Sequence, residues 1–177
     1  MLYPSLLAVH IVSGIFWGGG AIIGGFFLVP SVMAAGPGGG AVMAHMVQRK
    51  FSIWMTLGAL GSVLTGLALI SIQAMNSPAW LWSAEGICLE IGGLMALGAF
   101  GIGIRVQKPM AERMAAIAAE AQAAGGQLTD QQKADLGHAQ NRMAGAARVA
   151  SYQLLVAAVL MGAHGLVAQA AAQMASH

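Results

Sequence analysis

The sequence predicts an all-α integral membrane protein whose four spans form an up-down-up-down bundle, with a helical hairpin between the third and fourth spans. Three observations indicate this fold class. Hydrophobic residues make up 58% of the 177 residues and charged residues only 8%, whereas a soluble domain is about 25% charged. The mean hydropathy is +0.72. Four separate apolar runs are also long enough to cross a bilayer, which takes about 20 residues.

The predicted spans belong to one domain that covers the whole chain. Their approximate ranges are 3–29, 51–75, 87–104 and 146–172, within a single transmembrane domain at 1–177. We expect the first span to end at Pro30, because proline lacks the backbone N–H that a continuing helix uses. This first run is too long for the apolar core of a signal peptide, so it is expected to remain as a span.

The segment 105–145 is predicted to form a helical hairpin outside the bilayer. Ala, Met, Glu and Arg, which are strong helix formers, are frequent in 106–124. Gly125-Gly126 then interrupts the helical pattern. Thr129 and Gln132 have the spacing of a capping box, which predicts that a second helix begins there.

The positions of the cations predict which side of the membrane each loop faces. Cytoplasmic loops carry the excess of Lys and Arg. The eight basic residues lie just before the second span or between the third span and the start of the fourth: Arg49, Lys50, Arg105, Lys108, Arg113, Lys133, Arg142 and Arg148. We therefore expect a multi-pass protein of the bacterial inner membrane, with the hairpin in the cytoplasm and both termini in the periplasm.

Two histidines fall within predicted spans, where an ionisable side chain is costly and indicates a function. His10 is about seven residues into the first span, and His164 is about eight residues from the outer end of the fourth. At 1.5 Å per residue, both are expected about 10 Å below the outer surface, on helices that touch. Glu90 is expected at a slightly shallower depth on the third span.

This pair of histidines predicts a cofactor or metal site. Two imidazoles at one depth could be the axial ligands of haem b or could bind copper. Gly14, one turn from His10, would let a porphyrin approach the helix, and Met161, three residues before His164, offers a thioether to copper. The alternative is structural, with the histidines hydrogen-bonding across helices to each other or to Glu90.

The first two spans carry motifs that resemble known families. His10 stands seven residues before Trp17, and this spacing places both side chains on one helix face. The segment resembles the first helix of the CopD-like copper-resistance membrane proteins, of related small membrane proteins of unknown function, and of the HemJ-type protoporphyrinogen oxidases. Arg49-Lys50-Phe51 and Leu64-Thr65-Gly66 are similar to the second helix of these families. The resemblance implies that His10 is a haem ligand and that Trp17 lines the same face.

These features lead to three hypotheses of function. The first is a cytochrome b-like electron carrier, with haem b between the first and fourth spans near the outer leaflet, that exchanges electrons with a quinone or a periplasmic redox partner. The second is a copper-binding or copper-transport protein that uses His10, Met161 and His164, with His45 receiving the ion on the inner side. The third is an accessory subunit of a larger membrane complex, or a homo-oligomer, that docks through the hairpin. Nucleic acid is not an expected partner.

Overall fold

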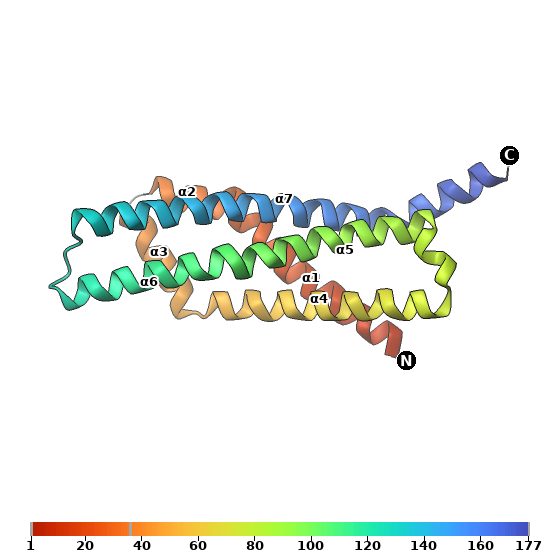
Figure 1. Cartoon of the computed structure of the whole chain (residues 1–177), viewed down its shortest axis with the longest axis horizontal. Coiled ribbons are helices and arrows are strands. Elements are labelled where there is room, and N and C mark those ends of the chain that lie inside the picture. The colour runs from red at the N-terminus through yellow and green to blue at the C-terminus, as the bar shows by residue number, and fades with distance from the viewer. Residues whose placement is uncertain (1, 36, 177) are drawn as a thin grey trace.

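Helices account for nearly all of the chain that the structure describes, residues 2–35 and 37–176 of a computed structural model (Figure 1). Within those two ranges there is no β-strand. The α-helices are α1 (Leu2–Ile23), α2 (Val29–Ala34), α3 (Pro37–Gln48), α4 (Phe51–Asn76), α5 (Ala84–Ile102), α6 (Lys108–Ala123) and α7 (Asp130–Ala175). Two π-helical turns, η1 (Gly24–Leu28) and η3 (Gly103–Gln107), and one 3-10 helix, η2 (Pro78–Trp82), connect them.

Four continuous helical stretches are long and apolar enough to cross a membrane. They are Leu2–Ala34, Phe51–Asn76, Ala84–Ala123 and Asp130–Met174. In the most apolar part of each stretch, only between 6% and 17% of the residues are buried inside the chain. Helices that are apolar on nearly all sides need an apolar solvent around them. The structure therefore confirms the all-α class and is consistent with a multi-pass membrane protein.

The first helical stretch does not end at Pro30, so that prediction is wrong. In η1 the backbone widens by one residue, and the Val29 N–H donates to the Gly24 carbonyl oxygen. Pro30 then lies in the first turn of α2 and the chain continues in helical conformation to Ala34. A proline in a first turn removes no hydrogen bond that the new segment needs. The π-helical turn is the reason the helix passes the proline.

A second π-helical turn, followed by a proline, joins α5 to α6. In η3 the Lys108 N–H donates to the Gly103 carbonyl oxygen, and Pro109 follows in the first turn of α6. In both places the proline stands six residues after the glycine that opens the π-helical turn. The helix expected to continue from the third span into the hairpin is present as one stretch, Ala84–Ala123.

The predicted hairpin and its capping box are confirmed. Gly125 and Gly126 have φ angles of 94° and 87°, which L side chains rarely adopt, and they turn the chain between α6 and α7. The Thr129 side chain accepts from the Gln132 N–H, and the Gln132 side chain accepts from the Thr129 N–H. An ion pair between Arg113 and Asp135, 2.9 Å long, links the two helices further along.

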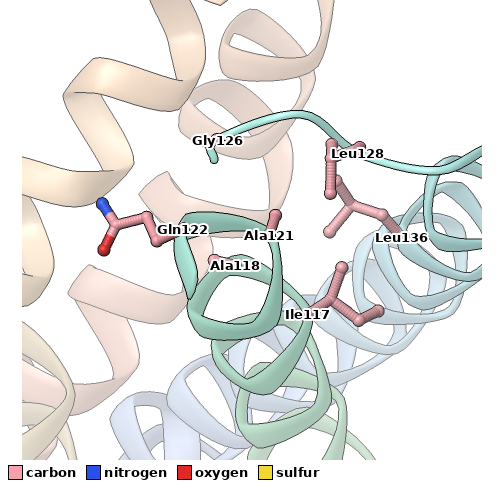
Figure 2. A pocket seen from close by; sticks show the side chains of 7 residues that line it. All are labelled: Ile117, Ala118, Ala121, Gln122, Gly126, Leu128 and Leu136. Atoms are coloured by element: carbon pink, nitrogen blue, oxygen red, sulfur yellow. The ribbon is translucent and has the colours of Figure 1, made fainter. Parts of the chain in front are cut away.

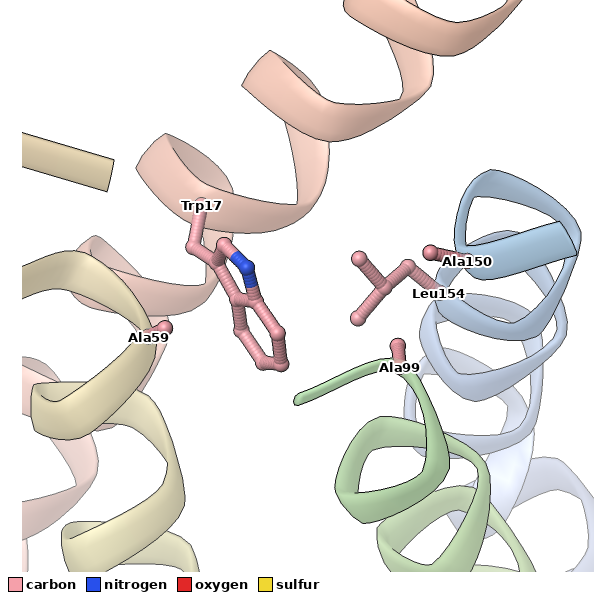
Figure 3. Packing of buried hydrophobic residues seen from close by; sticks show 5 residues of the cluster. All are labelled: Trp17, Ala59, Ala99, Ala150 and Leu154. Atoms are coloured by element: carbon pink, nitrogen blue, oxygen red, sulfur yellow. The ribbon is translucent and has the colours of Figure 1, made fainter. Parts of the chain in front are cut away.

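The bundle consists of two helix pairs, α1 with α4 and α5 with α7, and α1 crosses obliquely from α4 towards α7 (Figure 1). The pairs meet around the indole of Trp17, which is 8% exposed. Figure 3 shows Trp17 between the helices with Leu154 of α7 pointing towards it, and the rest of the cluster is Ala59, Ala99 and Ala150. Trp17 also contacts Phe100 edge to face, with ring centroids 6.3 Å apart. Trp17 is therefore the centre of the core.

Small residues let the end of α1 and the turn η1 approach α7 closely, further along the chain than Trp17. A Cβ added to Gly25 would collide with Ser151, and it would lie 2.8 Å from the Ala147 carbonyl oxygen. Ser151 is 0% exposed, and its hydroxyl lies 2.7 Å from the Ala21 carbonyl oxygen of α1. The expectation that the first and last spans are neighbours is therefore met at this crossing.

Candidate functional site

The imidazole of His10 is held by α4. Its Nδ1 lies 2.9 Å from the Ser62 carbonyl oxygen. A carbonyl oxygen can only accept, so Nδ1 carries the proton, and in the neutral ring Nε2 keeps its lone pair. The Thr65 hydroxyl, 3.3 Å from the same Nδ1, is a second acceptor because it donates its own proton to the Gly61 carbonyl oxygen.

Gly66 provides the space for this ring. A Cβ on Gly66 would lie 2.8 Å from His10 Cε1 and 3.2 Å from His10 Nδ1. Residues on one face of α4, Ser62, Thr65 and Gly66, thus supply the acceptors and the space together. The Leu64-Thr65-Gly66 motif of the second span is thus in contact with His10, and this contact between helices is not predictable from either segment alone.

Two other predicted site residues of α1 have packing contacts. A Cβ on Gly14 would lie 3.5 Å from Ser62 Oγ, so Gly14 faces α4 and not an open space for a porphyrin. Trp17 lies seven residues beyond His10 and fills the centre of the bundle. Trp17 therefore lies on the same face of α1 as His10, two turns further along the helix.

His164 lies on the other helix pair. Its Nδ1 lies 2.6 Å from the Met161 carbonyl oxygen, so this ring too carries its proton on Nδ1 and keeps a lone pair on Nε2 when neutral. His164 Nε2 is 3.9 Å from Glu85 Oε1 of α5, and the two side chains are 41% and 37% exposed. Glu85, and not the predicted Glu90, is therefore the carboxylate that His164 approaches. The Glu90 side chain is half-buried, and in the described part of the chain it makes no hydrogen bond or ion pair.

His10 and His164 lie at different depths. His10 contacts Gly66, ten residues before α4 ends at Asn76, which corresponds to about 15 Å. His164 contacts Glu85, the second residue of α5, and η2 joins these ends of α4 and α5. The prediction that both histidines lie at one depth assumed that the fourth span ends at the membrane surface. In the structure α7 projects beyond the connection between α4 and α5 (Figure 1).

The distance between His10 and His164 along the bundle limits which metal sites a single chain can form. Two nitrogen ligands on opposite sides of a metal ion stand about 4 Å apart, since each bond is about 2 Å. An offset of about 15 Å along the bundle keeps His10 and His164 from binding one iron within a single chain. Met161 faces α5, where a Cβ on Gly92 would lie 3.1 Å from its Cγ. Among the described residues, no group of three or more His, Cys, Asp or Glu could hold a metal ion.

Two grooves lie away from both histidines. One, of about 240 Å³, is at the tip of the hairpin, where the side chains of Ile117, Leu128 and Leu136 converge and that of Gln122 points away (Figure 2). The other, of about 270 Å³, runs along α5 and η3 from Leu97 to Val106. Neither is lined by a histidine.

Comparison with known proteins identifies no relative. No protein-family model, no curated protein and no solved structure matches the chain. The likeness to the CopD-like and HemJ-type proteins therefore rests on the motifs around His10 and in the second span alone.

Proposed function

We propose that this protein binds haem b through His10 and carries electrons in the membrane. The observation that supports it is the hydrogen bond from His10 Nδ1 to the Ser62 carbonyl oxygen, 2.9 Å long. A histidine that ligates a metal almost always donates its other N–H in this way, which orients the ring and makes the ligating nitrogen more basic. His10 is thus prepared as a ligand before any cofactor binds.

Each residue around His10 has a role in this proposal. His10 Nε2 is the ligand, the Ser62 carbonyl and Thr65 hydroxyl orient the ring, and Gly66 leaves the ring its space. Trp17, two turns along the same helix face, packs in the core of the bundle. A haem held here would supply one-electron exchange between a quinone or periplasmic donor and an acceptor, with a potential set by the ligand, its hydrogen bonds and burial.

The proposal includes an up-down-up-down topology with both termini in the periplasm. Contacts between helices support it, because they bring the cations to one level. Gly25 contacts Ser151, three residues from Arg148. A Cβ on Gly20, four residues before η1, would meet Met55, five residues after Lys50. Arg105 lies in η3, at the inner end of α5. A band of cations at one level is typical of a cytoplasmic interface.

Visible absorption spectra of the detergent-purified protein test the haem proposal. With adequate haem supply, the wild-type protein should show a Soret band that shifts after reduction with dithionite. His10→Ala should lose the bound haem. His164→Ala is the matched control and should retain it, because His164 lies about 15 Å away along the bundle. A wild-type protein without a Soret band would refute the proposal.

A second candidate function, copper binding at the outer end of the bundle, is favoured by the contact between His164 and Glu85. Imidazole and carboxylate suit Cu²⁺, and the thioether of Met161 suits Cu⁺. Metal analysis after copper loading should then find copper in the wild-type protein and in His10→Ala but not in His164→Ala. Equal copper content in both variants would argue against this site.

A further inference from the structure

The groove along α5 is apolar, open to the outside of the bundle, and ends at a cation. Its volume is about 270 Å³, and its lining residues are Leu97, Gly98, Gly101, Ile102, Arg105 and Val106. Gly98 and Gly101 contribute no side chain, and a Cβ on Gly101 would meet nothing within 4 Å. The exposed side chain of Arg105 stands seven residues after Gly98, on the same helix face.

A second arginine lies on α7, near the contact between α5 and α7 that adjoins the groove at Gly98; this contact and the groove are together called the seam. Gly98 faces Gln153 of α7, since a Cβ on Gly98 would lie 2.8 Å from Gln153 Nε2. Arg142 precedes Gln153 by eleven residues, or about three helical turns, so it is on the same face of α7. The helices run antiparallel, and Arg105 and Arg142 are therefore within about 6 Å of each other along the axis.

No acidic residue compensates these two arginines. The sequence has no Asp or Glu in 91–111 or in 136–177. In the described part of the chain, neither Arg105 nor Arg142 makes a hydrogen bond or an ion pair with a side chain. The positive charge at this end of the groove is thus available to an anion from outside the chain.

We propose that this seam binds one anionic phospholipid. Its phosphate would lie between Arg105 and Arg142, and one acyl chain would lie in the groove over Gly98 and Gly101. Arginines bind phosphate strongly through paired hydrogen bonds, and basic pockets between helices at the cytoplasmic side suit anionic headgroups. The apolar groove leading away from the arginines favours a diacyl lipid over a free phosphate ion. This inference is independent of the haem proposal.

Native mass spectrometry of the full chain in detergent tests the headgroup contact, with dioleoyl phosphatidylglycerol as the probe. Arg105→Ala and Arg142→Ala should each weaken its binding about fivefold. Arg148→Ala is the matched control, because Arg148 stands six residues from Arg142 and points to another side of α7. It should change binding less than twofold. Equal losses in all three variants, or equal binding of dioleoyl phosphatidylcholine, would overturn the proposal.

The acyl-chain contact needs its own pair of variants. Gly101→Leu fills the groove and should weaken binding of phosphatidylglycerol at least fivefold, although both arginines remain. Gly103→Leu, two residues further on, lies outside the groove and has equally open surroundings, so it should bind lipid like the wild-type protein. Unchanged binding by Gly101→Leu would overturn the proposal. Displacement of the lipid by millimolar inorganic phosphate would also overturn it, because the site would then recognise only the ion.

Discussion

The imidazole of His10 occupies the space that Gly66 leaves on α4, where a Cβ would lie 2.8 Å from His10 Cε1. The same ring has two polar contacts on this face of α4, with the Ser62 carbonyl oxygen and the Thr65 hydroxyl. The position of the His10 ring on α1 therefore requires a glycine at position 66 of α4. It links the packing of α1 on α4 to the orientation of the proposed ligand.

Gly66→Ala should displace the His10 ring and weaken haem binding. The added methyl group overlaps Cε1, and overpacking of a tight site costs about 1–3 kcal/mol. We expect a lower thermal unfolding midpoint in detergent and a reduced Soret band. Gly19→Ala is the control, because a Cβ there meets nothing within 4 Å. If Gly66→Ala binds haem like the wild-type protein, His10 is not the ligand or the ring does not need this space.

Gly25→Ala should disrupt the crossing of α1 and α7. Its Cβ would collide with the Ser151 side chain and lie 2.8 Å from a backbone oxygen, which cannot move as a flexible side chain can. We expect a destabilisation of about 2 kcal/mol, measured by unfolding in mixed micelles. The adjacent Gly24→Ala has open surroundings and should leave stability unchanged. Similar effects of the two variants would contradict the crossing described here.

Gln153→Leu should leave the stability of the protein unchanged or raise it by about 1 kcal/mol. Gln153 Oε1 is buried and has no hydrogen-bond partner among the described residues. A buried acceptor without a donor is unfavourable, so replacing it with an apolar group of similar size removes a cost. Thermal unfolding of the variant beside Ser151→Ala, which loses a buried hydrogen bond, gives the comparison. A loss of more than 1 kcal/mol in Gln153→Leu would show that Oε1 has a partner in the membrane.

Labelling of single cysteines in intact cells should verify the proposed topology. Cys88 is buried, so Cys88→Ala supplies a background without a competing thiol. A membrane-impermeant maleimide should label Met174→Cys from outside, because the C-terminal end of α7 is proposed to be periplasmic. Gln131→Cys, in the hairpin, should react only after the cells are opened. Labelling in the reverse pattern would invert the topology, and the cation band would then face the periplasm.

Local signals in the sequence were sufficient for the helices and the hairpin. The capping box of Thr129 and Gln132 depends on hydrogen bonds within four residues, and the turn at Gly125-Gly126 depends on backbone conformation at those two residues. Both were therefore predictable. The rule that a helix ends at proline failed at Pro30, because the π-helical turn before it shifts the backbone pairing by one residue.

The sequence by itself determined that this chain is an all-helical, apolar protein with histidines inside its spans, because composition and periodicity depend only on neighbouring residues. Only the tertiary structure decided how those histidines are paired. Depth counted from the end of a helix assumes that all helices begin at one plane, whereas α1 crosses the bundle obliquely and α7 projects beyond it (Figure 1). Contacts between helices therefore brought His10 to Gly66 and His164 to Glu85. Crossing angle and register come from side chains that meet across helices, and no single segment of the sequence contains that information.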